Sequence, residues 1–174
     1  IDEDLAGNET EIRTQNTSLV NALQELSTST ASDSINAMPL DSARQVLERS
    51  FDATDGGFGE APKFPHPTNL ERLLRHWARS RTAGGSGDRR ALHMVVFSLE
   101  KMARGGLFDQ LGGGVCRYSV DNHWMIPHFE KMLYDNGALL ALYAEASAAT
   151  GNPLFARVCR QTADWVMREM QSPE

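Results

Sequence analysis

Residues 105–136 read GGLFDQLGGGVCRYSVDNHWMIPHFEKMLYDN, and this stretch constrains the fold more than any other part of the chain. It follows a run of apolar residues with helical spacing, and a second such run begins near its end. Glycines lie between the two runs. Glycine weakens helix interiors and permits tight turns, so the helix is expected to be interrupted there. The sequence therefore predicts two helices joined by a long, glycine-rich loop.

A shorter stretch, DGGFGEAPKFP at residues 55–65, resembles the first. Each opens with a Gly-Gly pair near an aromatic residue and closes near a Pro-x-Phe sequence, and the two lie about 50 residues apart. Two of only three lysines, Lys63 and Lys131, occupy these matching closing motifs. We interpret the pattern as a weak repeat of helix, glycine-rich loop and helix, which stacks into an open solenoid or a closed toroid.

Apolar residues recur at helical spacing through most of the remaining chain. Asp88 is suited to cap the N-terminus of one helix, and Gly151 is suited to end another. Pro127 and Pro153 are suited to first turns. These signals predict helices at about residues 9–26, 43–51, 70–77, 92–102, 127–149 and 153–170.

No segment alternates apolar and polar residues over the length of a full strand. Residues 115–120 are the best short candidate, as one arm of a small β-hairpin near 105–120. We therefore predict an all-α fold of helical hairpins, with at most this one small β element.

The formal net charge of −6 belongs to the N-terminal part of the chain. Residues 1–38 carry seven acidic side chains and one basic, whereas residues 39–174 carry sixteen of each. A balanced body disfavours a nucleic-acid or polybasic membrane surface, and no apolar run approaches the roughly 20 residues of a membrane span. We expect an acidic arm at 1–38, with one helix and a Ser/Thr-rich linker at 27–34, and a main domain at 39–174.

Neither cysteine suggests a redox or metal site. Cys116 and Cys159 form no CxxC motif, so free thiols in a reducing, cytoplasmic compartment are expected. The pair His123 and His128 has a proline between its members, which prevents a shared helix face. We predict no metal and no cofactor.

The loop at 105–136 is the candidate functional site, because it mixes aromatic, acidic, basic and amide side chains on a helical frame. This mixture suits a sugar-like ligand. In a helix that begins at Pro127, the side chains of His128, Lys131 and Asp135 share one stripe. The first-turn N–H groups would favour Glu130 as an anion and oppose protonation of His128, which could then act as a general base.

Each of these residues also has a purely structural interpretation. Lys131 and Asp135 could form an ordinary surface ion pair. Glu130 could stabilise the helix start without touching a ligand, and His128 could be a structural hydrogen-bonding group. Trp124 and Phe129 could be core residues, as large aromatic side chains usually are.

The motifs GGFGEAPKFP and GGLFDQLGGGVCRYSVDNHWMIPHFEKMLYDN resemble those of a known family, the highly conserved proteins that contain a thioredoxin domain and include the spermatogenesis-associated relatives. The resemblance covers about residues 39–174. It implies an α/α toroid, similar to the N-acylglucosamine 2-epimerase and six-hairpin glycosidase folds, after an N-terminal thioredoxin-like domain. The chain lacks that domain, so redox activity does not carry over, and we expect it to be a fragment forming the first half of a barrel.

The resemblance implies that the functional side chains lie on loops at one end of the barrel. The implied catalytic residues are His128, Glu130 and Asp135, and the implied substrate-binding residues are Lys63, Asp109, Arg117, Tyr118, Trp124 and Lys131. One hypothesis is therefore a carbohydrate-processing toroid, epimerase- or hydrolase-like, that binds a sugar-like small molecule. The alternative is a non-catalytic helical scaffold or interaction module that accompanies a thioredoxin-like domain. Helix faces left uncovered in half a toroid would promote homo-oligomers.

Overall fold

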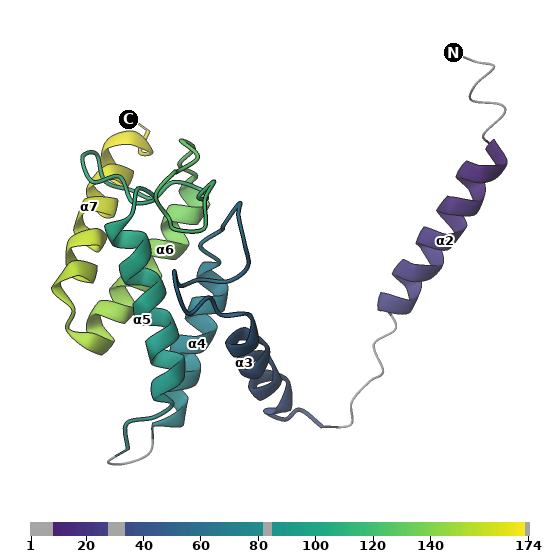
Figure 1. Ribbon diagram of the computed structural model, residues 1–174, viewed down its shortest axis with the longest axis horizontal. Helices are drawn as coiled ribbons and strands as arrows, with labels where there is room; N and C mark the ends of the chain where they lie inside the picture. The colour runs from purple at the N-terminus through teal and green to yellow at the C-terminus, as the bar shows by residue number, and fades with distance from the viewer. Residues whose placement is uncertain (1–8, 28–33, 82–84, 173–174) are drawn as a thin grey trace. The chain divides into compact units, whose positions relative to one another are not determined.

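The computed structural model describes residues 9–27, 34–81 and 85–172. These residues divide into two compact units, one within 1–36 and the other within 37–174. The described residues of the first unit contain helix α2 (Glu9–Ser27), at the position predicted from periodicity (Figure 1). Its apolar side chains, including Leu19 and Leu26, are exposed. Most of the segment predicted as a Ser/Thr-rich linker, residues 28–33, lies outside the described residues.

The second unit is built from helices, as predicted. Four of them match the expected positions closely, and α6 begins later than expected. The helices are α3 (Met38–Ser50), α4 (Pro67–Ser80), α5 (Arg89–Arg104), α6 (Leu133–Thr150) and α7 (Pro153–Glu169).

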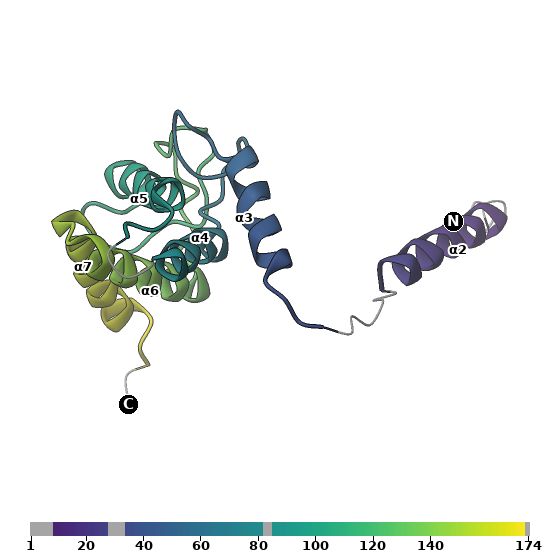
Figure 2. The same ribbon diagram turned by 90° about the horizontal axis from the view of Figure 1, so that it is seen from below.

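These helices form two layers of antiparallel hairpins (Figures 1 and 2). Helix α4 packs on α5 and α6 packs on α7, while α4 lies beside α6, α5 lies beside α7, and α3 contacts α4 and α5. Both long connections, residues 51–66 and 105–132, gather at one end, which we call the loop end. The fold thus brings together the two stretches that the sequence singled out.

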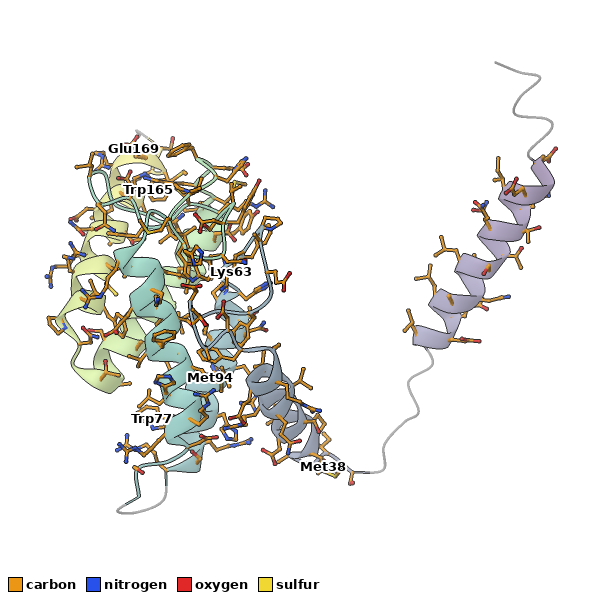
Figure 3. The ribbon with its side chains drawn as sticks, viewed as in Figure 1. Met38, Lys63, Trp77, Met94, Trp165 and Glu169 are labelled. Carbon is orange, nitrogen blue, oxygen red and sulfur yellow. The ribbon has the colours of Figure 1, made fainter. Side chains whose placement is uncertain are left out.

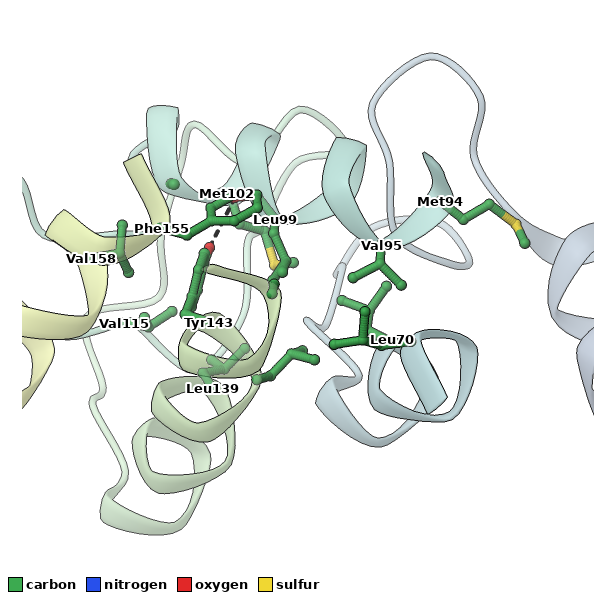
Figure 4. Close-up of a cluster of buried hydrophobic side chains, with 14 of the residues drawn as sticks. Leu70, Met94, Val95, Leu99, Met102, Val115, Leu139, Tyr143, Phe155 and Val158 are labelled. Carbon is green, nitrogen blue, oxygen red and sulfur yellow. Dashed lines mark hydrogen bonds between the residues drawn. The ribbon is translucent and has the colours of Figure 1, made fainter. Parts of the chain in front are cut away.

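A continuous apolar core joins the two layers (Figure 4). Leu70, Val95 and Leu99 are fully buried, and Phe155 of α7 packs edge-on against Tyr143 of α6. The Tyr143 hydroxyl donates a hydrogen bond to the Leu99 carbonyl oxygen at 2.9 Å. Burial raises the pKa of Tyr143, so this hydroxyl stays protonated and ties α6 to α5.

Helix α5 begins at the N-cap that the sequence predicted. The Asp88 carboxylate accepts hydrogen bonds from the backbone N–H groups of Arg90 and Ala91. A hydrogen bond from Arg44 lowers the pKa of Asp88 to about 2, despite partial burial. The cap therefore also connects α3 to α5 through the Arg44 guanidinium, 2.7 Å from the carboxylate.

The predicted start of the next helix at Pro127 is wrong, because α6 begins at Leu133. Residues 126–130 pair with residues 117–120 instead, and they contain a tight turn in which the N–H of Glu130 donates to the His128 carbonyl at 2.7 Å. The N–H of His128 donates to the Tyr118 carbonyl at 2.9 Å, and the N–H of Arg117 donates to the Glu130 carbonyl at 2.7 Å. Proline suits an extended segment as well as a first helical turn, so the local signal did not separate the two.

The small β-hairpin considered near 105–120 is reduced to isolated bridges, and the described residues contain no strand. Phe108 bridges Val115, but the pairing stops there. The side-chain amide of Asn136 accepts from the Val115 N–H at 2.7 Å and donates to the Val115 carbonyl at 2.9 Å. A buried side chain on α6 therefore occupies the place that a neighbouring strand would take.

The first glycine-rich loop begins with a tight turn. Phe51 bridges Phe58, and the N–H of Asp52 donates to the Gly57 carbonyl at 3.0 Å. In return, the N–H of Gly56 donates to the Asp52 carbonyl at 2.9 Å. The Asp52 carboxylate also accepts hydrogen bonds from the backbone N–H groups of Thr54 and Asp55, which stabilises the turn.

The second glycine-rich loop repeats this turn bond for bond. Phe108 bridges Val115, the N–H of Asp109 donates to the Gly114 carbonyl at 3.0 Å, and the N–H of Gly113 donates to the Asp109 carbonyl at 3.0 Å. The internal repeat is therefore real, but its register differs from the one suggested by the sequence. A Phe-Asp pair opens each turn, so Gly56–Gly57 correspond to Gly113–Gly114 and not to Gly105–Gly106.

The second glycine of each turn lies under a tryptophan. Gly57 has a φ of +76°, and a Cβ atom there would lie 2.6 Å from the Trp124 ring. Gly114 has a φ of +79°, and a Cβ atom there would lie 2.7 Å from the Trp165 ring. Both positions therefore need glycine for the backbone conformation and for the space.

We predict that Gly57→Ala destabilises the protein by clearly more than Gly59→Ala. Gly59 has a φ of +75° with no atom within 4 Å of a Cβ, so alanine there meets only the left-handed backbone cost of about 1–2 kcal/mol. Alanine at Gly57 adds the collision with Trp124. Urea unfolding followed by circular dichroism measures both, and equal losses would contradict this description of the loop.

Candidate functional site

The residues predicted from the sequence separate into two groups at the loop end. The side chains of one group form hydrogen bonds and ion pairs within the loops. Those of the other group lie on a neighbouring surface, and two of them, Arg117 and Asp135, line a small cavity. The first group is Lys63, Asp109, Trp124 and Lys131, and the second group is Arg117, Tyr118, His128, Glu130 and Asp135.

Lys63 is fully buried, with 0% of its side chain exposed. Its ammonium donates to the Asp52 carboxylate at 2.6 Å and to the Asn122 carbonyl at 3.2 Å. The same ammonium lies 5.2 Å from the centre of the Trp124 ring. Backbone bonds of 2.7 and 2.9 Å also join Lys63 to Ser119. Lys63 thus connects the first loop to the second.

Trp124 is also interior, as its structural interpretation predicted. Its indole N–H donates to the Asp55 carbonyl at 2.8 Å, and the ring covers Gly57. The neighbouring His123 ring lies 2.8 Å from the Asp55 carboxylate. His123 is therefore paired with an acid, and no cluster of three or more potential metal ligands occurs in the part of the chain that the structure describes.

Lys131 repeats the role of Lys63 in the second loop. Its ammonium donates to the Asp109 carboxylate and to the Gly113 carbonyl, both at 2.7 Å, and lies 5.2 Å from the centre of the Trp165 ring. The interpretation of Lys131 as a surface partner of Asp135 is therefore wrong. The hydrogen bond from Lys131, with those from two backbone N–H groups, lowers the pKa of Asp109 to about 2.

The two lysines form equivalent clusters, which we call the first clamp (Asp52, Lys63 and Trp124) and the second clamp (Asp109, Lys131 and Trp165). Lys63 and Trp165 both lie toward the loop end, whereas Trp77 lies toward the other end of the helices (Figure 3). Each clamp joins an acid at the start of a glycine turn to a lysine at the end of the same loop. The clamps thus close the loops, and in this structure their lysines face protein groups.

We predict that Lys63→Met destabilises the protein by about 3 kcal/mol, because the partly buried Asp52 carboxylate then lacks its positively charged partner. Although burial raises the pKa of Asp52, hydrogen bonds from Lys63 and from the backbone lower it overall, so this carboxylate is charged near neutral pH. Lys101→Met is the matched control, since that side chain is 38% exposed and sits 3.5 Å from its acid.

Urea unfolding of the two lysine variants checks the first clamp. The control should change the free energy of unfolding by no more than about 1 kcal/mol, as exposed ion pairs do. Losses of similar size in the two variants would show that Lys63 does not hold the loop.

The second group of predicted residues lies on the paired segments 117–120 and 126–130. The Arg117 guanidinium lies 3.2 Å from the Glu130 carboxylate. The His128 ring stacks on Tyr118 at 4.6 Å between centres, and Tyr118 in turn contacts the Phe64 ring at 4.8 Å. The His128 ring nitrogen is 3.7 Å from the Glu130 carboxylate. Charged and aromatic groups therefore alternate on one exposed surface.

Beside this surface is a cavity of about 180 Å³, which we call the polar cleft. Arg117 and Asp135 are the charged residues of its lining. Two prolines, the rings of Phe64 and His66, and Leu139 of α6 form most of the remaining wall. One carboxylate oxygen of Asp135 is buried and accepts no hydrogen bond from the described protein groups. The lining residues are Phe64, Pro65, His66, Pro67, Thr68, Arg117, Asp135 and Leu139.

The environment of Asp135 raises the pKa of its carboxyl group above the ordinary value. Burial raises the pKa of Asp135, the positive charge of Arg117 lowers it, and the negative charge of Glu130 raises it again, for a net increase. A carboxyl group whose pKa is raised beside an arginine can hold a proton that a neighbouring ligand could take.

The predicted helical position of His128 and Glu130 and the predicted core position of Phe129 are both wrong. His128 and Glu130 precede α6, so helix N–H groups do not act on them, and the argument for a neutral His128 loses its basis. Phe129 is 91% exposed and is not a core residue. Sequence reasoning also missed Phe64 and His66 as lining residues, although Phe64 belongs to the first Pro-x-Phe motif.

Comparison with known proteins fits this architecture. Spermatogenesis-associated protein 20 of rat is 42% identical over 127 residues, which are 72% of this chain and 16% of that protein. The chain is homologous to part of spermatogenesis-associated protein 20. The human protein is 41% identical over the same length, and an uncharacterised protein of Caenorhabditis elegans is 46% identical over 98 residues. The family resemblance seen in the sequence is thereby confirmed.

The match has a limited extent. The aligned region spans only 16% of the length of the mammalian homologues, so it says little about the rest of those proteins. No protein-family model matches the chain.

Solved structures confirm the fold class. A sugar epimerase from a ruminal bacterium superposes with a TM-score of 0.56 and 15% identity, covering 75% of this chain and 37% of that one. Cellobiose 2-epimerase from Bacillus thermoamylovorans gives a TM-score of 0.56 at 16% identity, covering 80% and 39%. The hairpins therefore match part of an epimerase-type α/α toroid. No helix in the described part of the chain has the length and apolarity needed to cross a membrane.

Proposed function

We propose that the polar cleft binds a sugar-like small molecule and that Asp135 transfers a proton to or from it. The observation that carries the proposal is the buried, unpaired carboxylate oxygen of Asp135 beside Arg117 in a cavity with an aromatic wall. The likeness of the fold to two sugar epimerases supports the choice of ligand class.

The surrounding residues suit a polyhydroxylated ring. Arg117 supplies hydrogen-bond donors, and the Phe64 ring, which packs against the Tyr118 ring, offers an apolar surface on which a sugar ring can stack. His128 stacks on Tyr118, and Glu130 pairs with Arg117. We assign these two residues as the candidates for a second proton-transfer group beside Asp135. Epimerisation and hydrolysis both need such a pair of proton-transfer groups, so the proposal covers either reaction.

The test is a panel of mono- and disaccharides titrated into the protein and its Asp135→Asn variant, with binding followed by NMR. Loss of an uncharged hydrogen bond of about 0.5–1.5 kcal/mol should weaken binding by roughly two- to tenfold. Asp164→Asn, at an exposed acid on α7, should leave affinity unchanged. Where turnover is detectable, activity that needs protonated Asp135 should fall as the pH rises through its raised pKa.

Two results would contradict the proposal. One is a panel in which no sugar perturbs Phe64, Arg117 or Asp135. The other is a sugar whose affinity is the same for the Asp135→Asn and Asp164→Asn variants.

A second candidate function is a non-catalytic helical scaffold that accompanies a thioredoxin-like domain. It is favoured by the internal engagement of Lys63, Asp109, Trp124 and Lys131, which the sugar-binding hypothesis had assigned to substrate. Absence of sugar binding, together with a large stability loss in the Lys63 variant, would select this function. Both cysteines are free, and we propose a reducing compartment such as the cytoplasm for either function.

A further inference from the structure

A second and larger cavity, of about 520 Å³, opens at the loop end, and we call it the apolar cavity. Its volume falls within the roughly 300–1,000 Å³ typical of small-molecule sites. The polar cleft and the apolar cavity share none of their lining residues. The apolar cavity is lined by Gly106, Phe108, Asp109, Gln110, Leu111, Cys116, Pro127, Phe129 and Lys131.

The segment 127–131 contributes both to this cavity and to the surface around Tyr118. Pro127, Phe129 and Lys131 line the apolar cavity. The intervening His128 stacks on Tyr118, and Glu130 pairs with Arg117. One short segment therefore presents mostly apolar side chains to the cavity and polar side chains to the Tyr118 surface.

The walls of the apolar cavity are held in place. Phe108 and Cys116 are buried and belong to the core cluster, so the floor is continuous with the protein interior. A Cβ atom on Gly106 would lie 2.3 Å from the Met125 carbonyl oxygen, so these two backbone segments are in close contact. At the rim, Leu111 is 99% exposed and Phe129 is 91% exposed. The cavity therefore combines a fixed apolar floor with exposed apolar edges.

The charges in the wall cancel each other. Among the described lining residues the charged ones are Lys131 and Asp109, whose side chains meet at 2.7 Å. The second hydrogen bond of the Lys131 ammonium is to the Gly113 carbonyl. A charged ligand would lose hydration without finding an unpaired counter-charge, which is costly, whereas an uncharged one would not.

We propose that the apolar cavity is a second binding site, which takes an uncharged, planar aromatic molecule. Phe129 provides the ring contact, Leu111 and Pro127 the remaining accessible apolar surface over the floor formed by Phe108 and Cys116, and the paired charges exclude ionic ligands. This site goes beyond the proposed sugar binding, because it depends on none of the residues of the polar cleft.

Indole is the probe, and indole-3-acetate is its charged counterpart. Each is titrated into isotope-labelled protein, and backbone amide shifts are followed by NMR. Indole should shift the signals of residues 106–111, 116 and 129, and indole-3-acetate should bind at least about tenfold more weakly, a difference of about 1.4 kcal/mol. Shifts confined to His66 and Asp135, or no saturable shifts at all, would overturn the proposal.

Phe129→Ala tests the rim directly. Loss of an aromatic contact worth about 0.5–1.5 kcal/mol should weaken indole binding by roughly two- to tenfold, with unfolding unchanged because the ring is exposed. Ile126→Ala is the matched control, since Ile126 is exposed on the same segment but does not line the cavity. The proposal fails if the two variants bind indole equally well, or if indole-3-acetate binds as tightly as indole.

Discussion

A buried lysine ammonium is the interaction on which the loop end depends. Lys63 lies in the interior between an acid of its own loop and a carbonyl of the next, under an indole ring. Removing such a charge from water is expensive, and the cost is offset only where the partners are placed accurately. A short bond to Asp52 and a second hydrogen bond to Asn122 meet this requirement, so the loops have little freedom to take other paths.

The second clamp repeats this arrangement of acid, lysine and tryptophan in the second glycine-rich loop. Each clamp needs a Phe-Asp turn, two glycines with positive φ, a distant lysine and a covering tryptophan. The paired segments 117–120 and 126–130 flank Trp124 of the first clamp and lie between Asp109 and Lys131 of the second. Their two faces line the polar cleft region and the apolar cavity, so both candidate sites follow from how the clamps close the loops.

Much of the helical frame was predictable because its signals are local. Asp88 caps α5, and Gly151 ends α6 with a left-handed backbone, as the sequence suggested. The start of α6 was not predictable, because Pro127 is compatible with both a helix and an extended segment, and the choice depends on pairing with Tyr118. The same long-range pairing removed His128 from the helix.

The site was harder to predict than the frame. The matching positions of Lys63 and Lys131 were visible in the sequence, and so was Asp109 as a candidate residue. The pairing of each lysine with an acid was not visible, since Asp52 lies before the first glycine-rich stretch. A Phe-Asp pair at the same distance before each Gly-Gly pair was the available signal. Burial decides whether a lysine binds a ligand or closes a loop, and burial depends on contacts between distant segments.

The most direct test of this account is a pair of double-mutant cycles, on Asp52–Lys63 and on Asp109–Lys131, with Glu9–Arg13 as an exposed reference pair. The account predicts coupling energies above about 1 kcal/mol for both clamps, larger for the buried first clamp, against about 0.3–0.5 kcal/mol for the reference. Coupling in either clamp no greater than in the reference pair would contradict it.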